Sequence, residues 1–143
     1  MGQEDRYRLA PLRNVRERDE RAVRGDLAAK VGDARETQAR VEAARARTVA
    51  ARTALTEAVS AREHSATAAQ LAAADRFIAR RRRELDDAIG EELRAELAHE
   101  ARIDHVDEAR ARLARARADR QIIERHFERW RDARRKLADR RED

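Results

Sequence analysis

One pair of side chains has the spacing of a metal site. Glu96 and His99 form a Glu-x-x-His pair, the helical spacing that di-iron bundles use. Such bundles need two of these pairs and two further glutamates. The other histidines, at 64, 105 and 126, are too dispersed to complete a site. The sequence therefore predicts no metal centre.

Nucleophilic and phosphate-binding chemistry also lack the residues they need. Ser60 and Ser65 have no base that the sequence places near them, and the chain has no cysteine. The glycines, at 2, 25, 32 and 90, are scattered and form no phosphate-binding loop. We therefore expect a protein that is not an enzyme and that uses no cofactor.

The composition favours long helices over a globular core. Of the 143 residues, 44% are charged and 3% are aromatic, with four glycines and one proline. The apolar 41% is mostly alanine, which has the best helix propensity but buries little surface. These proportions are typical of long helices or a coiled coil. Disorder is the competing interpretation, because the mean hydropathy is low.

The sequence contains no evident targeting or membrane segment. Its start, MGQEDRYRLAPLRN, has no apolar core for a signal peptide, and Arg6 stands where a myristoylation motif needs a hydroxyl residue. The longest apolar run, in QLAAAD, is far shorter than the ~20 residues of a membrane span. We expect a cytoplasmic protein with no direct membrane insertion.

The first helix is predicted over about residues 5 to 62. Pro11 suits its first turn, because the fixed φ of proline fits a helix and its missing N–H is not needed there. An apolar or small row then recurs at spacings of three and four: Val23, Leu27, Ala34, Val41, Ala44, Thr48, Ala51 and Leu55. Lys30 and Thr37 fill gaps in this row, so the seam is weak.

The turn is predicted at about residues 63 to 67. TAAQ, residues 67 to 70, has the form of a capping box, in which the threonine accepts from the backbone N–H three residues on. SARE, residues 60 to 63, has the same form, and no glycine or proline marks the break. A single unbroken helix is the alternative.

The second helix is predicted over about residues 68 to 140. It carries a stripe of Ile78, Leu85, Ile89, Leu93 and Leu97, and then a heptad row of Val106, Ala109, Leu113, Ala116, Arg120, Ile123, Phe127, Trp130, Arg134 and Leu137. The change of phase near residues 97 to 103 resembles a stutter. Two helices with one narrow apolar face each bury these faces by packing antiparallel. The predicted fold class is all-α, a long antiparallel two-helix coiled-coil hairpin in which residues 1–143 form one domain.

Aromatic residues are concentrated at the end of the hairpin that carries both termini. With a turn near residue 65, residue i faces roughly residue 130 − i, so Phe127 and Trp130 lie opposite or beyond the start of the chain. The apolar residues there are Tyr7, Leu9 and Leu12. Two interpretations fit: a terminal aromatic cluster of Tyr7, Phe127 and Trp130 that closes the hairpin, and an exposed anchor for a partner.

Charge is divided along the second helix. Residues 84–108 contain ten acids and two arginines, a net charge of −8, and residues 109–136 contain eleven bases and four acids, a net charge of +7. Residues 6–24, which the hairpin places beside the basic block, have a net charge of +4. Like charges side by side oppose packing, so this end favours an acidic partner. A second basic run, RRRR at 80–83, is equally well explained as a solvated helix face.

A nucleic-acid-binding helix is one alternative function. In dimeric basic-region proteins the basic helix precedes the zipper, whereas here the block at 109–136 overlaps the seam. The block also lacks the asparagine or interleaved aromatics that read or stack on bases. The sequence therefore predicts no specific nucleic-acid binding, and leaves salt-sensitive electrostatic binding open.

Three stretches of the chain resemble the FliJ/YscO family of type III export stalk proteins. The opening YRLAPLRNVRERDERAVRGDLAAK has the aromatic-x-Leu-x-x-Leu pattern followed by an Arg/Glu-rich helix. AAQLAAADRFIARRRRELDDAI, residues 68–89, resembles the family's start of the second helix, with its Phe-aliphatic pair. ERHFERWRDARRKLADRRED is similar to family endings, particularly on the injectisome side.

This resemblance implies a non-catalytic central stalk at the inner-membrane export apparatus, flagellar or injectisome. Such proteins insert their terminal end into the hexameric export ATPase, promote its assembly or activity, and link it to the export-gate membrane protein. Some also handle secretion chaperones. The ATPase-binding residues expected here are Arg13, Arg16 and Arg24 in the first helix and Arg125, Arg129 and Arg131 in the second.

The export-gate contact implied by the resemblance lies toward the turn. The positions that match the family's motif are Phe77 and, one turn on, Arg81. Family members often have an apolar residue at the second position, so the arginine implies a charged or shifted contact. A stalk is expected to be monomeric alone. The rival interpretation, a self-associating structural coiled coil, predicts a larger mass in solution.

Overall fold

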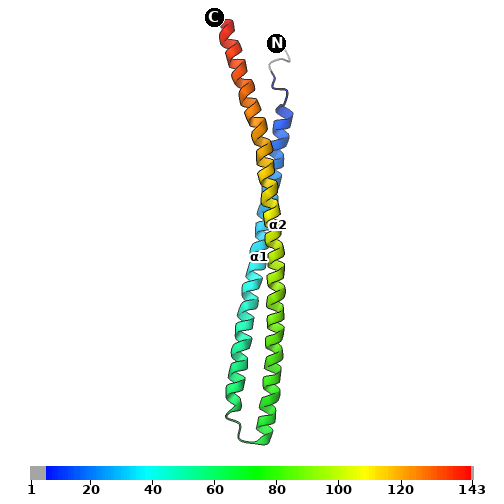
Figure 1. Cartoon of the computed structure of the whole chain (residues 1–143), viewed down its shortest axis with the longest axis vertical. Helices are drawn as coiled ribbons and strands as arrows, with labels where there is room; N and C mark the ends of the chain where they lie inside the picture. Colours follow the sequence, from blue (N-terminus) through cyan, green and yellow to red (C-terminus); the bar gives the residue numbers. More distant parts are fainter. Residues whose placement is uncertain (1–5, 143) are drawn as a thin grey trace. The chain divides into compact units, whose positions relative to one another are not determined.

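The computed structural model describes residues 6–142, which form two α-helices joined by a short turn (Figure 1). Helix α1 spans Ala10–Arg62 and helix α2 spans Ala68–Glu142. The expected fold class, an all-α antiparallel two-helix hairpin, is confirmed. The chain divides into two compact units, unit 1 (Met1–Val31 and His105–Asp143) and unit 2 (Gly32–Asp104), and α1 packs against α2 within each.

Helix α1 begins at Ala10, later than the predicted start at about residue 5, which lies outside the described residues. Proline has no N–H to donate to the carbonyl four residues earlier, and its ring clashes with that carbonyl in a helix interior. Pro11 is therefore confined to the first turn, and the Tyr7 carbonyl accepts a turn hydrogen bond from the Ala10 N–H at 3.1 Å instead.

The turn in unit 2 lies where the capping box predicts it. The Gln70 N–H donates to the Thr67 hydroxyl at 3.1 Å, and the Thr67 N–H donates back to the Gln70 side-chain oxygen at 3.2 Å. These two bonds satisfy backbone donors that a helix start leaves unpaired. At the other side of the turn, the Ser65 N–H donates to the Arg62 carbonyl at 3.0 Å, which tightens the end of α1.

The helices of unit 2 are paired in a register that differs from the prediction. Arg47 reaches Glu91 at 3.0 Å and Arg62 reaches Asp75 at 2.6 Å, so facing residue numbers add up to about 137, not 130. The difference is one heptad. It arises because Arg62, the last residue of α1, lies opposite a residue two turns inside α2 and not opposite its first turn.

The predicted apolar stripe of α2 in unit 2 is wrong beyond Leu85. Ile89, Leu93 and Leu97 are 45%, 57% and 57% exposed. The side chains that face α1 instead continue at spacings of three and four, without a change of phase: Ile78, Arg81, Leu85, Ala88, Glu92, Ala95 and His99. Small residues let two helices approach closely. Ala88 and Ala95 therefore face α1, where larger side chains were predicted.

Opposite this row, α1 contributes the small and aliphatic residues that the sequence predicts. They are Ala34, Thr37, Val41, Ala44, Thr48, Ala51, Leu55 and Ala58, all buried or half-buried. The hydroxyls of Thr37 and Thr48 donate to backbone carbonyls of their own helix, which satisfies them inside the seam.

An ion pair beside the turn gives unit 2 a testable dependence on pH. The hydrogen bond from Arg62 to Asp75 holds the pKa of Asp75 below its ordinary value of 3.8. A carboxylate whose pKa is lowered by folding stabilises the fold above its ordinary pKa, and this contribution disappears as the pH falls through the lowered value.

We therefore expect Asp75→Asn to melt at a lower temperature than the wild type at pH 7. The difference between the two melting temperatures should shrink as the pH falls through the lowered pKa, because the carboxyl then becomes protonated in both states. Thermal melts followed by circular dichroism at a series of pH values below 7 measure this. Asp87→Asn, which removes an exposed carboxylate outside this pair, should show no such convergence.

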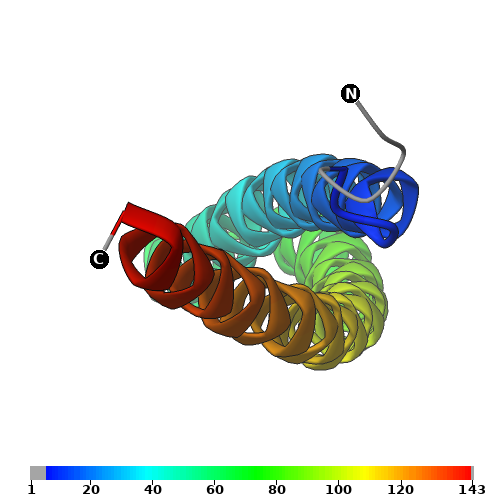
Figure 2. The same cartoon turned by 90° about the horizontal axis from the view of Figure 1, so that it is seen from above.

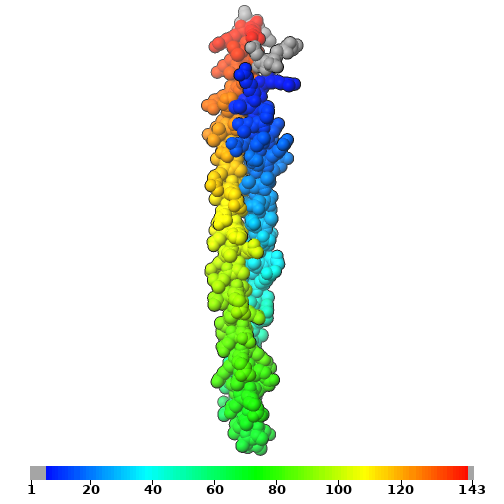
Figure 3. Space-filling view, turned by 90° about the vertical axis from the view of Figure 1, so that its right-hand side faces the viewer, coloured from blue at the N-terminus to red at the C-terminus, as the bar shows by residue number. Residues whose placement is uncertain are grey.

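Unit 1 is paired through a more polar seam. In α1 its inward residues are Arg13, Arg16, Glu20, Val23, Leu27 and Lys30, and in α2 they are Val106, Ala109, Leu113, Ala116, Arg120, Ile123, Phe127 and Trp130. In the space-filling view the first turns of α1 (blue) lie directly against the yellow-to-orange part of α2 (Figure 3). The heptad row predicted for this part of α2 is therefore inward-facing as far as Trp130.

The last turns of α2 leave the seam. Leu137, predicted as a seam residue, is 49% exposed. In both views the red end of α2 lies apart from the dark blue start of α1 (Figures 1 and 2). The register explains this, because a residue near 137 has no counterpart in α1, which begins at Ala10. Among the described residues, neither helix has a stretch long and apolar enough to cross a membrane.

Candidate partner-binding site

The arginines predicted on α1 are already engaged within unit 1. Arg13 donates to Glu124 at 2.7 Å, and its guanidinium lies 4.5 Å from the centre of the Phe127 ring. The hydrogen bond to Glu124 raises the pKa of Arg13 above its ordinary value. Arg16 reaches Asp119 at 3.4 Å. These guanidinium groups join α1 to α2, so their first role is in packing.

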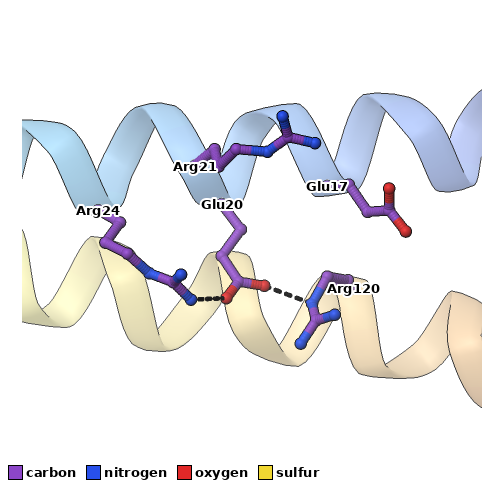
Figure 4. A pocket seen from close by; sticks show the side chains of 5 residues that line it. All are labelled: Glu17, Glu20, Arg21, Arg24 and Arg120. Carbon is purple, nitrogen blue, oxygen red and sulfur yellow. Dashed lines mark hydrogen bonds and ion pairs between the residues drawn. The ribbon is translucent and has the colours of Figure 1, made fainter.

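Arg24, the third predicted arginine of α1, belongs to a cluster around a buried carboxylate. Glu20 has a side chain only 6% exposed and accepts from Arg24 at 2.6 Å. Its other oxygen is paired with Arg120 of α2. Nε of Arg117 lies 3.8 Å from the oxygen that Arg24 contacts. Figure 4 shows Arg24 and Arg120 converging on Glu20 from the two helices.

This cluster borders a pocket of about 370 Å³ lined by Glu17, Glu20, Arg21, Arg24 and Arg120. In Figure 4 the Arg21 side chain extends along α1, away from the Glu20 carboxylate. Glu20 was not among the residues predicted from the sequence. Its seam position could have been predicted, because Glu20 stands three residues before Val23 and continues the same row toward the N-terminus.

The three aromatic residues lie together in unit 1. The Tyr7 ring centre is 5.1 Å from that of Phe127 and 5.3 Å from that of Trp130, and Phe127 stacks on Trp130 at 5.8 Å. The Tyr7 hydroxyl is 2.9 Å from Nδ1 of His126. Tyr7 is 8% exposed, while Phe127 and Trp130 are half-buried. The cluster fixes residues 6–9 against α2.

Beside this cluster is a second pocket, of about 410 Å³, lined by Arg6, Tyr7, Arg8, Leu9, His126 and Trp130. Its walls combine two guanidinium groups with aromatic edges. Such walls suit an acidic or aromatic side chain of a protein partner.

The arginines predicted on α2 are arranged differently from those on α1. Arg125, Arg129 and Arg131 are all exposed, and within residues 6–142 no carboxylate forms an ion pair with them. Arg125 and Arg129 line a pocket of about 470 Å³ together with Ile122, Glu128 and Asp132. Ile122 is 61% exposed. We call Ile122, Arg125 and Arg129, together with Arg131 on another side of the same stretch of α2, the α2 arginine surface.

The predicted gate-binding residues of unit 2 are in contact with each other. The guanidinium of Arg81 lies 4.8 Å from the centre of the Phe77 ring, and that of Arg80 lies 5.3 Å from it. Arg81 also donates to Glu84 at 2.7 Å and is half-buried in the seam. Phe77 is 37% exposed, so a partner would meet a ring that is in contact with two arginines.

The Glu-x-x-His pair of unit 2 is committed to other contacts. Glu96 accepts from Arg45 at 2.8 Å, and Nδ1 of His99 lies 2.9 Å from the Thr37 hydroxyl. Over the described part of the chain, no group of three or more metal-ligating side chains is present. The candidate site therefore consists of charged and aromatic side chains that can contact a partner.

No family model, curated protein or solved structure matches the chain.

Proposed function

We propose that this chain is a non-catalytic central stalk and adaptor of a type III secretion export ATPase. One observation carries the proposal: the α2 arginine surface presents three exposed guanidinium groups, whereas the α1 arginines are paired. In this proposal, unit 1 enters the ATPase hexamer, and the resemblance of the chain's opening and ending to the FliJ/YscO family supplies the identity of the partner.

The difference between paired arginines on α1 and unpaired arginines on α2 supports a choice among the predicted binding residues. A paired guanidinium must break its contact with a carboxylate before it meets a partner, and this loss offsets what the new contact contributes. An exposed unpaired arginine has no such contact to lose. We therefore assign ATPase binding to Arg125, Arg129 and Arg131, and a stabilising role within unit 1 to Arg13, Arg16 and Arg24.

The energy of such an interface comes from several weak contributions. One exposed ion pair contributes about 0–1 kcal/mol, so the charges mainly steer association and set its salt dependence. Apolar anchors supply the remainder, and Ile122 is the exposed aliphatic side chain that lines the same pocket as Arg125 and Arg129. An acidic pore surface of the hexamer is the complementary partner.

In the same proposal, Phe77 of unit 2 contacts the export gate. Its ring lies close to the guanidinium groups of Arg80 and Arg81, which supports a contact that is both aromatic and cationic. Secretion chaperones are further partners in this proposal. A protein of this kind acts at the inner-membrane export apparatus without catalysing a reaction itself.

The experiment compares ATP turnover and sizing profiles of the cognate export ATPase with and without this protein. We expect faster turnover and a shift toward the hexamer. The triple variant Arg125→Glu, Arg129→Glu, Arg131→Glu should weaken its apparent affinity for the ATPase at least tenfold, on the order of 1.4 kcal/mol, because each reversal puts a negative charge against an acidic surface.

The matched control reverses three exposed arginines of unit 2, Arg35, Arg40 and Arg52, with the same change in net charge. This control should stimulate the ATPase as the wild type does. No binding at low salt and no change in turnover would remove the stalk proposal. A concentration-dependent rise in the mass of the protein alone would favour a self-associating coiled coil.

A further inference from the structure

The exposed large aliphatic side chains of unit 2 lie on one side of its helix pair. They are Val49, Val59, Ile89, Leu93, Leu97 and Ile103, each at least 41% exposed. We call these six residues the lateral apolar surface. Single exposed apolar side chains are normal on any protein. Six on one side of a unit that has a seam of alanine and threonine are not explained by chance scatter.

Two ion pairs define the two edges of the seam in unit 2. Arg45 pairs with Glu96 along one edge, and Arg47 pairs with Glu91 along the other. Residues seven apart lie on the same face of a coiled-coil helix. Ile89 and Ile103 stand seven residues before and after Glu96, so both belong to the Arg45–Glu96 edge.

The remaining members of the surface follow from the same spacing. Val59 is fourteen residues after Arg45 and lies on its edge, and Val49 is one turn after Arg45 on the outward side. Leu93 and Leu97 extend from Ile89 at spacings of four, along one inclined row of α2. Phe77, by contrast, is fourteen residues before Glu91 and lies on the opposite edge.

Acidic side chains flank the apolar row of α2. Asp86 and Glu100 stand seven residues before and after Leu93, and Asp104 stands seven after Leu97, so all three lie on the same side as the row. They are exposed, and none of them forms an ion pair within the described residues. Carboxylates therefore lie beyond both ends of the apolar row.

Gly90 lies on this same side of α2, seven residues before Leu97. A Cβ at this position would meet only the end of the flexible Arg94 side chain, at 3.5 Å. Packing within unit 2 therefore does not require glycine here, although glycine in a helix interior costs about 1 kcal/mol relative to alanine. A residue without a side chain lets another helix approach the backbone closely.

We infer that the lateral apolar surface binds an amphipathic helix of another protein, one whose apolar residues recur every three or four positions and are flanked by lysine and arginine. The spacing of Ile89, Leu93 and Leu97 matches the anchors that such a helix presents. These residues span about 12 Å at the rise of an α-helix, so the partner contributes about two turns. Its basic flanks meet Asp86, Glu100 and Asp104.

On the α2 part of the surface, charge complementarity favours this occupant. Asp86, Glu100 and Asp104 are exposed and unpaired beside the apolar row, so a helix with acidic flanks would gain less there. The inference concerns unit 2 and does not depend on ATPase binding by unit 1.

The test uses a synthetic helical peptide of about four heptads, with leucine at the first and fourth positions of each heptad and lysine beside them. A second peptide carries glutamate in place of lysine. Fluorescence anisotropy of the labelled peptides measures binding to the full chain, at about 0.15 M salt so that non-specific charge attraction is screened. We expect the lysine peptide to bind and the glutamate peptide not to bind.

The protein variant Leu93→Gln, Leu97→Gln should weaken binding of the lysine peptide at least tenfold. The matched control is Val15→Gln, Leu137→Gln, which removes two similarly exposed aliphatic side chains from unit 1 and should leave binding unchanged. The charge variant Asp86→Asn, Glu100→Asn, Asp104→Asn should weaken binding and flatten its salt dependence.

Three outcomes would overturn the inference. The lysine peptide does not bind, or it binds equally well to the Leu93→Gln, Leu97→Gln variant, which would mean that only non-specific charge attraction is present. Alternatively, ultracentrifugation shows that the protein alone forms dimers that this variant abolishes, which would make a second copy of the chain the occupant of the surface.

Discussion

Glu20→Gln is expected to lower the free energy of unfolding of unit 1 by about 2 kcal/mol. The Glu20 side chain is 6% exposed and neutralises arginines from both helices, Arg24 on α1 and Arg117 and Arg120 on α2. Glutamine keeps the size of the side chain but leaves three guanidinium groups without their carboxylate. The loss stays below that of a fully buried pair because the arginines are 39–58% exposed.

Urea unfolding followed by the fluorescence of Trp130 measures this effect, because Trp130 is the one tryptophan of the chain and lies in unit 1. Glu17→Gln is the matched control. It removes the same charge one turn away, but the Glu17 side chain is 35% exposed and reaches Arg13 only at 3.8 Å. We expect this control to change the free energy of unfolding by less than about 0.5 kcal/mol.

A double variant separates charge from packing in the same place. Glu20 and Arg120 face each other in the seam, so Glu20→Leu with Arg120→Leu replaces an ion pair by an apolar contact. Such exchanges are often neutral or stabilising, and we expect the double variant to be at least as stable as the wild type. A Glu20→Gln variant as stable as the wild type would show that the arginines are satisfied by water.

Tyr7→Ala is expected to release residues 6–9 from α2 and to destabilise unit 1 by about 2 kcal/mol. Tyr7 is 8% exposed and its ring touches those of Phe127 and Trp130. Residues 6–9 precede α1, so the cost is limited to undocking this segment and uncovering the two rings. The emission of Trp130 should shift to longer wavelength and become more accessible to acrylamide without any denaturant.

Tyr7→Phe is the control for this prediction. It keeps the ring but removes the hydroxyl that lies 2.9 Å from His126, a contribution of about 1 kcal/mol. Its tryptophan emission should match that of the wild type. If Tyr7→Ala also leaves the emission unchanged, Phe127 and Trp130 are held by α2 and Arg13 alone, and the tyrosine does not close this end.

The turn and the seam of α1 could be predicted because their signals are local. Thr67 and Gln70 cap α2 with bonds that span three residues, so four letters of sequence suffice. The residues of the row from Val23 to Leu55 recur at a regular spacing along one helix. This spacing does not depend on how the second helix is placed. In α2 of unit 2 the predicted seam was wrong, because the large side chains of Ile89, Leu93 and Leu97 are exposed and alanines face α1.

The partners across the seam could not be predicted because the register depends on the geometry of the turn. A shift of one heptad leaves the inward face of each helix unchanged, so the row from Val106 to Trp130 was identified correctly. It changes every cross-helix contact, however. The predicted register places Arg13 near residue 117, whereas the structure pairs it with Glu124, and this pairing is what separates the engaged arginines of α1 from the exposed ones of α2.

The thin seam also determines how this protein responds to temperature. None of the large side chains in the described residues is fully buried, and the inward positions mix aliphatic residues with alanine, threonine and charged residues. The heat capacity of unfolding comes mainly from apolar surface that becomes hydrated. With less such surface to expose than a globular core has, the enthalpy and entropy of unfolding change slowly with temperature. We therefore expect the stability of the chain to vary little between cold and warm conditions.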